Sequence, residues 1–459
     1  MSHPCRRRNA ARSPFVPVMF GITLLLGTPT ASHAGDVVAA LSGGSLTLTG
    51  GPSDDLIAIT TIDADSLLVT PTAPTTVNGS PDPQTLNGFT GGIVVALGLG
   101  NNQTTITGVT VPGAVSLTGG SGGDVLTLET CTVGGGVTAD VGGGVNVLVL
   151  DKSGVTGKLA YKGGAGFDTL VVVETPISGA AAIGLGAGAN VATFAKSSIG
   201  GKLTLKGGAD ADTIVLSETP VAGTVGVTAG AGDNLFTLTT GSAGGALTYN
   251  GGAGADTIVL TGFTTPAPIK LSAGPGTNVV TTTNVAGKRL AYKGGAGNDV
   301  LSVTATTTLA TSVNVNAGAG DNVATFAGLT AGGKLTYKGG KGGDVVEIAS
   351  STIAGATNAD LGTGGSQLHV TTASTLGPLI VKSKNDADQI VLAGSHLTAD
   401  VKLGLGAGAN VVTLDGATVD GDLQVKTGGG DDQLTFLNGA VVMGIQKIDL
   451  GGGTNTITP

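Results

Sequence analysis

The stretch that decides the fold is residues 159–171, which read LAYKGGAGFDTLV. Apolar and polar residues alternate at both ends of this stretch with a period of two, as they do in β-strands with one buried face. Between the two ends lies a glycine-rich turn that closes on Asp168, whose carboxylate can hydrogen-bond the backbone of such a turn. The stretch therefore predicts a strand, a tight corner and a second strand.

The same pattern recurs along the chain, and the residue that closes each glycine-rich turn marks its position. From Asp124 onward the acidic markers follow one another at steps of 43 to 45 residues. A second series of markers, mostly Asn, lies halfway between them, so the unit has 22 residues and two alternating forms, with 18 copies in all. The acidic markers are Asp55, Asp124, Asp168, Asp212, Asp256, Asp299, Asp344, Asp388 and Asp432. The neutral markers are Asn102, Asn146, Asn190, Asn234, Asn278, Asn322, Ser366, Asn410 and Asn455.

The repeat unit predicts the fold class. Gly and β-branched residues dominate every unit, which excludes a helical hairpin repeat. Segments such as residues 175–179 predict a further corner and a short third strand. Two or three short strands in 22 residues make one coil of a stack in which each coil buries its inward side chains against its neighbours. We predict an all-β chain folded as a single-stranded parallel β-helix (β-solenoid) of about 18 coils of 22 residues.

The chain divides into three predicted segments. Residues 1–34 carry four Arg, an apolar run and a small-x-small site ending at Ala34, which together predict a signal peptide. Residues 35–101 contain turn signals between successive markers and predict an N-terminal capping segment with a first coil and an insertion. Residues 102–459 hold the β-solenoid repeats. We therefore expect an exported protein, either secreted or held at the cell surface.

Composition and net charge limit both the class of protein and the partners that this chain can bind. Of the 459 residues 83 are Gly, but Gly does not recur at every third position and there are only 17 Pro, which excludes collagen. Only 3% of the residues are aromatic and 12% are charged, and 40% are hydrophobic, a composition that argues against disorder. Without residues 1–34, which hold four Arg and no acid, the formal net charge falls from −9 to −13. Nucleic acid and anionic membranes are therefore not expected as partners, and the mature chain has no apolar run long enough for a transmembrane segment. Cys131 is the one Cys left, so an internal disulfide is excluded.

One motif points to a known family. Residues 163–171 fit G-G-x-G-x-D-x-U-x, as do residues 119–127, 251–259, 294–302 and 339–347. This motif resembles the calcium-binding nonapeptide of haemolysin-type (RTX) secreted proteins. The resemblance implies a parallel β-roll, Ca²⁺ bound at stacked Gly-Asp turns, and export in an unfolded state. The candidate calcium ligands are Asp124, Asp168, Asp212, Asp256, Asp299, Asp344, Asp388 and Asp432.

The spacing of the motif departs from that family. Here the motif occurs once per 44 residues, so two motif carboxylates lie two coils apart, about 9–10 Å. Calcium takes six to eight oxygens at about 2.3–2.6 Å, so one ion cannot bridge both carboxylates. A structural role explains the same pattern, because Asp and Asn hydrogen-bond turn backbones and an amide between two carboxylates halves the charge of the column. This structural interpretation is favoured, and calcium stays open. Further acids that would strengthen calcium sites are Asp54, Asp210, Asp233, Asp321, Asp386 and Asp431.

Three other columns recur with the coil. The four Tyr share one position of the strand before the turn, which favours core packing over an aromatic binding stripe. Lysines six residues before the acidic markers favour a solvated face that spaces like charges, rather than a polyanion site. Thr residues such as Thr193, three positions after the neutral markers, reflect β-propensity more than an ice-binding face. The Tyr are Tyr161, Tyr249, Tyr292 and Tyr337, and the lysines are Lys162, Lys206, Lys293, Lys338, Lys382 and Lys426.

Nothing in the sequence predicts catalysis. Beyond residue 34 only His369 and His396 remain, and neither belongs to a partner motif. A polysaccharide-active β-helix typically uses acidic clusters with a basic residue in long loops, whereas this chain has few loops and one Arg outside the signal peptide. We expect a non-enzymatic structural or adhesive protein with an unknown surface or extracellular partner. The alternatives are a calcium-binding RTX-like secreted protein and, less favoured, an ice-binding or polysaccharide-active β-helix.

Overall fold

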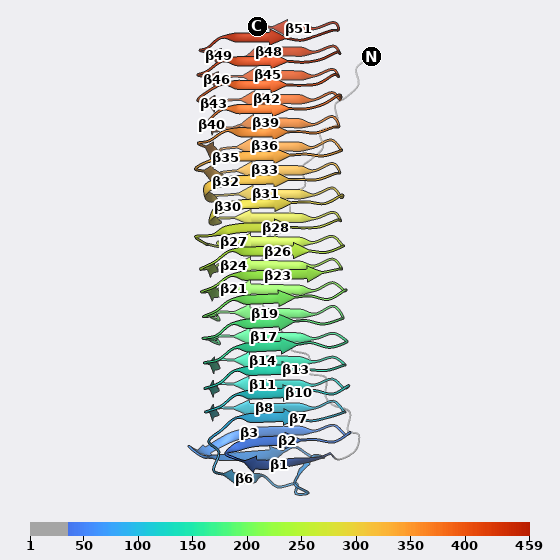
Figure 1. The fold of residues 1–459 in the computed structure, drawn as a ribbon, viewed down its shortest axis with the longest axis vertical. Coiled ribbons are helices and arrows are strands. Elements are labelled where there is room, and N and C mark those ends of the chain that lie inside the picture. Colours follow the sequence, from blue (N-terminus) through green and yellow to red (C-terminus); the bar gives the residue numbers. More distant parts are fainter. Residues whose placement is uncertain (1–34) are drawn as a thin grey trace. The chain divides into compact units, whose positions relative to one another are not determined.

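A computed structural model of the chain describes residues 35–459, and the predicted signal peptide at residues 1–34 lies outside this range. The described residues form strands, turns and bends with no helix, and so none that is long and apolar enough to cross a membrane. The strands stack into a parallel β-solenoid of about 17 turns with a period of about 22 residues (Figure 1). The predicted fold class is confirmed. The prediction of about 18 coils counted the 18 marker residues, and the intervals between successive markers number 17, which agrees with the observed turns.

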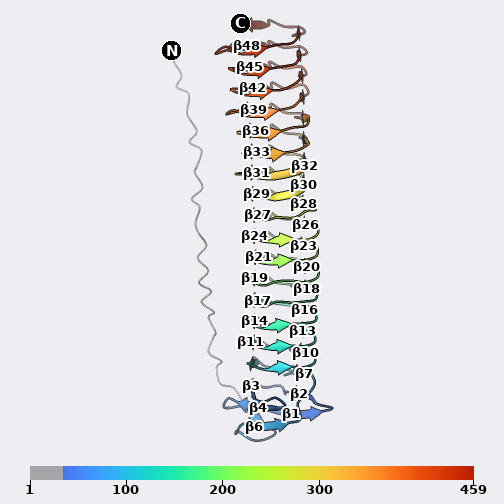
Figure 2. The same cartoon turned by 90° about the vertical axis from the view of Figure 1, so that its left-hand side faces the viewer.

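Two long sheets run the length of this stack, on opposite sides of it (Figure 2). Sheet 1 holds the strands before each glycine-rich corner, and sheet 2 holds the strands after it. Sheet 1 contains β2 (Ser45–Thr49), β7 (Ile93–Ala96), β10 (Val115–Thr118), β13 (Val137–Asp140), β16 (Leu159–Lys162), β18 (Ala181–Gly184), β20 (Leu203–Lys206), β23 (Val225–Gly230), β26 (Leu247–Gly251), β28 (Pro268–Ser272), β30 (Ala286–Lys293), β32 (Thr308–Asn316), β35 (Lys334–Lys338), β38 (Thr357–Asp360), β41 (Leu379–Lys382), β44 (Val401–Gly404), β47 (Leu423–Lys426) and β50 (Gln446–Asp449). Sheet 2 contains β3 (Leu56–Asp63), β8 (Gln103–Thr107), β11 (Val125–Glu129), β14 (Val147–Asp151), β17 (Thr169–Val173), β19 (Val191–Ala195), β21 (Thr213–Ser217), β24 (Leu235–Thr239), β27 (Thr257–Thr261), β29 (Val279–Thr283), β31 (Val300–Thr304), β33 (Val323–Ala327), β36 (Val345–Ala349), β39 (Gln367–Thr371), β42 (Gln389–Ala393), β45 (Val411–Asp415), β48 (Gln433–Leu437) and β51 (Thr456–Thr458).

A short third strand follows sheet 2 in most coils, as the segment at residues 175–179 predicts. In other coils it is reduced to a single parallel bridge, such as that between Val155 and Ile177. The third strands are β9 (Thr110–Val111), β12 (Thr132–Val133), β15 (Gly154–Val155), β22 (Pro220–Val221), β25 (Ser242–Ala243), β34 (Thr330–Ala331), β37 (Thr352–Ile353), β40 (Thr375–Leu376), β43 (His396–Leu397), β46 (Thr418–Val419) and β49 (Val441–Val442).

The core lies inside the coils, and each strand contributes alternate side chains to it. In the coil of β16 and β17 the inward residues are Leu159, Tyr161, Leu170, Val172 and, from the third side, Ile177, all at most 3% exposed. Each has its counterpart directly above and below, because parallel pairing keeps equivalent residues in register. Burying a large apolar side chain contributes about 1.5–3 kcal/mol, so the repeated column supplies most of the driving force for stacking.

The two ends of the solenoid differ. At the N-terminal end antiparallel strands cover the edges: β1 (Asp36–Ser42) pairs with β2, and β4 (Ser66–Pro71) pairs with β3. Beyond them lie β5 (Thr76–Val77) and β6 (Gln84–Asn87), which pair with β1 and β4. Such covering hides unpaired backbone groups that otherwise invite edge-to-edge association. At the other end, β50 and β51 are the last strands of sheets 1 and 2.

Candidate functional site

The marker residues form one column at the glycine-rich corner. Each marker directly precedes a sheet 2 strand, so the register of that sheet places Asp168 beside Asn190 and Asn190 beside Asp212. Seven of the eight candidate calcium ligands are at most 2% exposed, and Asp124 is partly buried. The eight predicted residues therefore lie in one column along the stack, with a neutral marker between each successive pair, and are not gathered at a single point.

Hydrogen bonds join the markers into a continuous ladder. The backbone N–H of Asp168 donates to Oδ1 of Asn190 at 2.9 Å. The backbone N–H of Asn190 donates to Oδ1 of Asp212 at 2.9 Å, and the Asn190 side-chain amide donates to the same oxygen at 3.0 Å. The amide also donates to the carbonyl of Gly188 in its own turn at 2.7 Å. We call this column the corner ladder. The paired bonds from backbone and amide to a carboxylate recur at Asn102, Asn146, Asn234, Asn278, Asn322 and Asn410.

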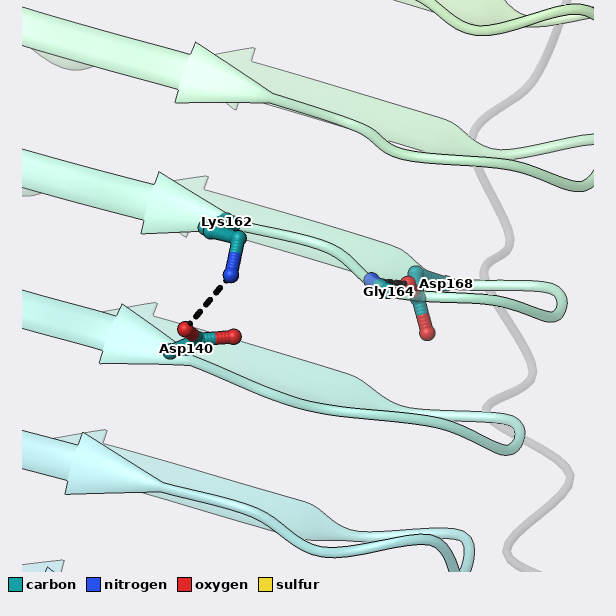
Figure 3. A network of polar contacts seen from close by, with 4 residues as sticks. All are labelled: Asp140, Lys162, Gly164 and Asp168. Atoms are coloured by element: carbon teal, nitrogen blue, oxygen red, sulfur yellow. Dashed lines mark hydrogen bonds and ion pairs between the residues drawn. The ribbon is translucent and has the colours of Figure 1, made fainter.

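The second carboxylate oxygen bonds the turn of its own coil. Gly164 donates its backbone N–H to Oδ2 of Asp168 at 2.9 Å, as Figure 3 shows. Gly120, Gly208 and Gly295 make the same bond in their coils. In these four coils the Asp thus holds both its own turn and the neighbouring coil.

In the coils of Asp256, Asp344 and Asp388 a hydroxyl lies near the carboxylate. Oδ2 of Asp256 has no partner within hydrogen-bonding geometry, and neither does the hydroxyl of Tyr249 in the same coil. The two groups are nevertheless close enough that each shifts the pKa of the other. We interpret this as a contact just short of a full hydrogen bond. The same pairing of unpartnered oxygens occurs for Tyr337 with Asp344 and for Ser383 with Asp388, where the hydroxyl opposes the rise in the pKa of the carboxyl. Oδ2 of Asp432 and the hydroxyl of Thr427 are likewise buried without a partner.

The tyrosine column has a polar function that the sequence prediction did not include. The four Tyr are at most 3% exposed, which confirms core packing and contradicts a binding stripe. Each lies seven residues before an acidic marker, and none occurs in a coil with a neutral marker. Burial, with the carboxylate of the same coil as the next cause, raises the pKa of the hydroxyl. The strict pairing of Tyr with Asp was the sequence signal for this contact.

Burial also sets the electrostatics of the carboxylates. It raises the pKa of Asp55 to about 6, with smaller contributions from the nearby charges of Asp36 and Asp54, while the nearby backbone N–H of Gly51 lowers it. Burial is likewise the largest cause that raises the pKa at six other markers, where bonds from backbone N–H or side-chain groups oppose it. These are Asp124, Asp168, Asp212, Asp256, Asp344 and Asp388.

This donor set fits calcium poorly. Calcium prefers six to eight oxygen ligands, whereas Oδ1 of markers such as Asp212 is already bonded by two N–H groups. Among residues 35–459 no group of three or more His, Cys, Asp or Glu is arranged to hold a metal ion. Calcium binding by the eight carboxylates therefore stays a prediction.

The additional acids beside the corner also bond neighbouring coils. Oδ2 of Asp210 accepts the backbone N–H of Gly188 at 2.9 Å, and Oδ1 of Asp321 accepts that of Gly343 at 2.8 Å. Both lie in exposed corner loops, and their charges add to the burial that raises the pKa of Asp212 and of Asp344. The same bond to a neighbouring coil is made by Asp54, Asp233, Asp386 and Asp431.

A second ladder, which the sequence prediction missed, lies at the corner after sheet 2. Ser153 accepts the backbone N–H of Cys131 at 3.0 Å, and Thr175 accepts that of Ser153 at 3.1 Å. The Ser153 hydroxyl donates to the carbonyl of Asp151 at 3.0 Å. We call this column the hydroxyl ladder. The residue before each member of this column, such as Lys152 with φ 48° before Ser153, takes the left-handed conformation that turns the chain. Buried Cys131 belongs to this column, which explains it without a reactive role.

The remaining surface features of the described residues are a groove and the two histidines. A shallow groove of about 960 Å³ follows the third strands from Pro176 to Ala310, lined by small and apolar residues with one charge, Lys288. His396 pairs with Asp420 at 2.9 Å on the surface. Half-buried His369 of β39 lies beside Glu347 of β36 in the register of sheet 2. Among the described residues these features assemble no nucleophile with a base.

The sequence was also compared with known proteins. No protein family matches the chain, and no curated protein sequence is similar to it. The resemblance to haemolysin-type repeats therefore rests on the nonapeptide motif alone.

Proposed function

We propose that this chain is an exported, non-enzymatic repeat protein with a structural or adhesive role outside the cell. The observation that carries the proposal is the corner ladder, in which the chain itself satisfies the polar groups of its corners. Because Asn190 supplies both an acceptor to Asp168 and donors to Asp212, the stack has an internal alternative to bridging cations. A rigid column that repeats one coil suits a spacer or a scaffold with extended faces.

The proposed location rests on the N-terminal sequence. Residues 1–34 have the charged, apolar and small-residue regions of a secretory signal peptide, with a site that ends at Ala34. Expressing the full chain in a bacterial host and determining the N-terminus by mass spectrometry tests this proposal. We expect a product that begins at Gly35 outside the cytoplasm. A chain that keeps residues 1–34 and stays in the cytoplasm would contradict it.

The second candidate is a calcium-stabilised, RTX-like secreted protein. Its specific support is that Oδ2 of Asp256, Asp344, Asp388 and Asp432 is buried without a full hydrogen bond in the described residues. Oxygens of this kind are ligands that calcium accepts. Under this alternative, calcium would raise the melting temperature of the folded chain and chelation would lower it. The ladder proposal expects neither change.

A further inference from the structure

Sheet 1 gathers cations on its outward face, although the chain as a whole is acidic. Lys162 ends β16, and parallel register places Lys206 two coils further on, with Gly184 between them. Lys158 directly precedes β16, and Lys202 takes the same place before β20, because Leu159 and Ala181 bond the carbonyls of Ala180 and Lys202. Each of these coils therefore carries a cation at both ends of its strand.

The cations form two parallel rows, which we call the lysine rails. The first rail precedes the inward residues of sheet 1, and the second follows them. Successive cations along a rail lie two coils apart at the closest, about 9.6 Å, and the rails are about 13 Å apart across the strand. The first rail is Lys158, Lys202, Arg289 and Lys334, and the second is Lys162, Lys206, Lys293 and Lys338.

The floor between the rails is flat and uncharged over most of its length. Ala160, Ala182, Thr204 and Gly226 occupy successive outward positions there, and Lys270 adds a ninth cation further along. No Asp or Glu occupies an outward position of sheet 1 between residues 158 and 338. Over the same coils the outward face of sheet 2 has no cation and one acid, Glu347. The outward face of sheet 1 is therefore basic in these coils, although the net charge of the whole chain is negative.

Most of these cations are not neutralised by the chain. Of these nine cations only Lys162 has a carboxylate of the described residues within salt-bridge distance, that of Asp140 at 2.8 Å (Figure 3). The nearby acids Asp210 and Asp321 lie in the corner loops, where they bond backbone N–H groups. The rails thus present exposed positive charge to solvent.

From this arrangement we infer that the outward face of sheet 1 binds an acidic polysaccharide with one anionic group per disaccharide. The inference deepens the proposed adhesive role and rests on it. It replaces the interpretation of these lysines, drawn from the sequence alone, as a solvated face that only spaces like charges, because the second row of cations across the strand is apparent only from the register of sheet 1. An extended disaccharide is close in length to two coils, so successive acidic groups meet Lys162 and Lys206, and again Lys293 and Lys338. The four coils between Lys206 and Lys293 correspond to two disaccharides, so the acidic group between them meets no cation of this rail. Sugar rings lie against the floor of small residues, where Ala160 and Gly226 leave room for them.

Nucleic acid fits this face less well. Each strand of a duplex carries one phosphate per about 3.4 Å of helix axis, far more densely than the cations of one rail. Binding of single strands also uses aromatic side chains on which bases stack, and every Tyr of the chain is buried inside the coils.

The test measures binding of hyaluronan, a polysaccharide with one carboxylate per disaccharide, to residues 35–459. This part folds as its own compact unit and lacks the four Arg of the signal peptide, which would themselves attract polyanions. We expect binding at low salt that weakens as salt rises, and no binding of neutral dextran. Removing four cations of the second rail should weaken binding by roughly tenfold or more. That variant carries Lys162→Ser, Lys206→Ser, Lys293→Ser and Lys338→Ser, and the column already contains Ser272.

A matched variant removes the same charge elsewhere, from Lys152→Asn, Lys196→Asn, Lys341→Ser and Lys384→Ser. Equal loss of binding in both variants would show that only net charge matters, and would overturn the inference. So would the absence of hyaluronan binding at low salt, or tighter binding of single-stranded DNA of equal charge. A chain that is exported and folded yet binds no polysaccharide would remove this inference alone. Circular dichroism confirms that each variant is folded.

Discussion

At the residue scale, the buried carboxylates predict an unusual dependence of stability on pH. Asp55 is fully buried and its pKa is raised to about 6, so the folded chain holds this proton more tightly than the unfolded chain, whose Asp titrates near 3.8. The free energy of unfolding contributed by Asp55 therefore falls as pH rises from about 4 to about 6. We expect a higher melting temperature at pH 5 than at pH 7.5.

Replacing Asp55→Asn removes this titration, so the difference in melting temperature between pH 5 and 7.5 should shrink. Asp82→Asn, in the exposed loop between β5 and β6, provides the control and should leave the difference unchanged. Stability that instead rises from pH 5 to pH 7.5, in the absence of metal, would contradict the assignment.

Glycines of the corner are required by the adjacent coil as well as by the turn. A Cβ on Gly164 would lie 1.6 Å from the carbonyl oxygen of Gly142, whereas a Cβ on Gly154 would meet no atom within 4 Å. Gly164→Ala should therefore destabilise the chain by about 1–3 kcal/mol or more, because backbone of the neighbouring coil must move. Gly154→Ala is the matched control and should be neutral. Urea denaturation measures both, and equal effects would refute the steric explanation.

At the element scale, the strands and their stacking could be predicted from the sequence, because a 22-residue period and a two-residue alternation are both visible in it. The sequence shows which repeats are one residue shorter or longer than 22, but it does not show at which corner of the coil the length changes. The step from Asn278 to Asp299 is one residue short, and the step from Asp299 to Asn322 is one residue long. The structure absorbs both at the corner before sheet 1, where β30 and β32 run on from the third strand with a register shift between Gly287 and Arg289.

The candidate site was predicted less completely. The alternating carboxylates and amides were identifiable, since each closes a glycine-rich turn. The direction of their hydrogen bonds could not be predicted, because the spacing of residues along the sequence does not show whether the Asn190 amide donates to the preceding or to the following coil. The hydroxyl ladder was not predicted, because Ser and Thr such as Ser153 and Thr175 are common turn residues. Their shared column can be recognised only when the coils are aligned on the corner after sheet 2.

The N-terminal strands predict what protects the solenoid from self-association. Deleting residues 35–42 removes β1 and leaves the edge of β2 unpaired. We expect dimers or larger assemblies and a lower melting temperature, because an exposed edge strand pairs with another chain. Light scattering after size-exclusion chromatography measures the assembly. A Gly-Ser insertion after Gly43 lengthens the turn but keeps β1, and should stay at the size of the unmodified chain. A monomeric deletion variant would contradict this function of β1.

At the scale of the whole molecule, the two ladders and the repeated core act along every coil, so local stability is shared with the nearest neighbours. A chain with this design has its polar corners filled by its own side chains and its apolar residues buried in one continuous column. The faces of sheets 1 and 2 then remain free for contacts outside the coil, with sheet 1 the basic one.

The measurement that tests the central claim most directly is thermal unfolding of residues 35–459, followed by circular dichroism in EDTA and across a calcium titration. The central claim is that the corner ladder holds the coils together without metal. It predicts a β-rich spectrum in EDTA and a melting temperature that calcium leaves unchanged. A chain that is unfolded in EDTA and folds on addition of calcium would contradict it.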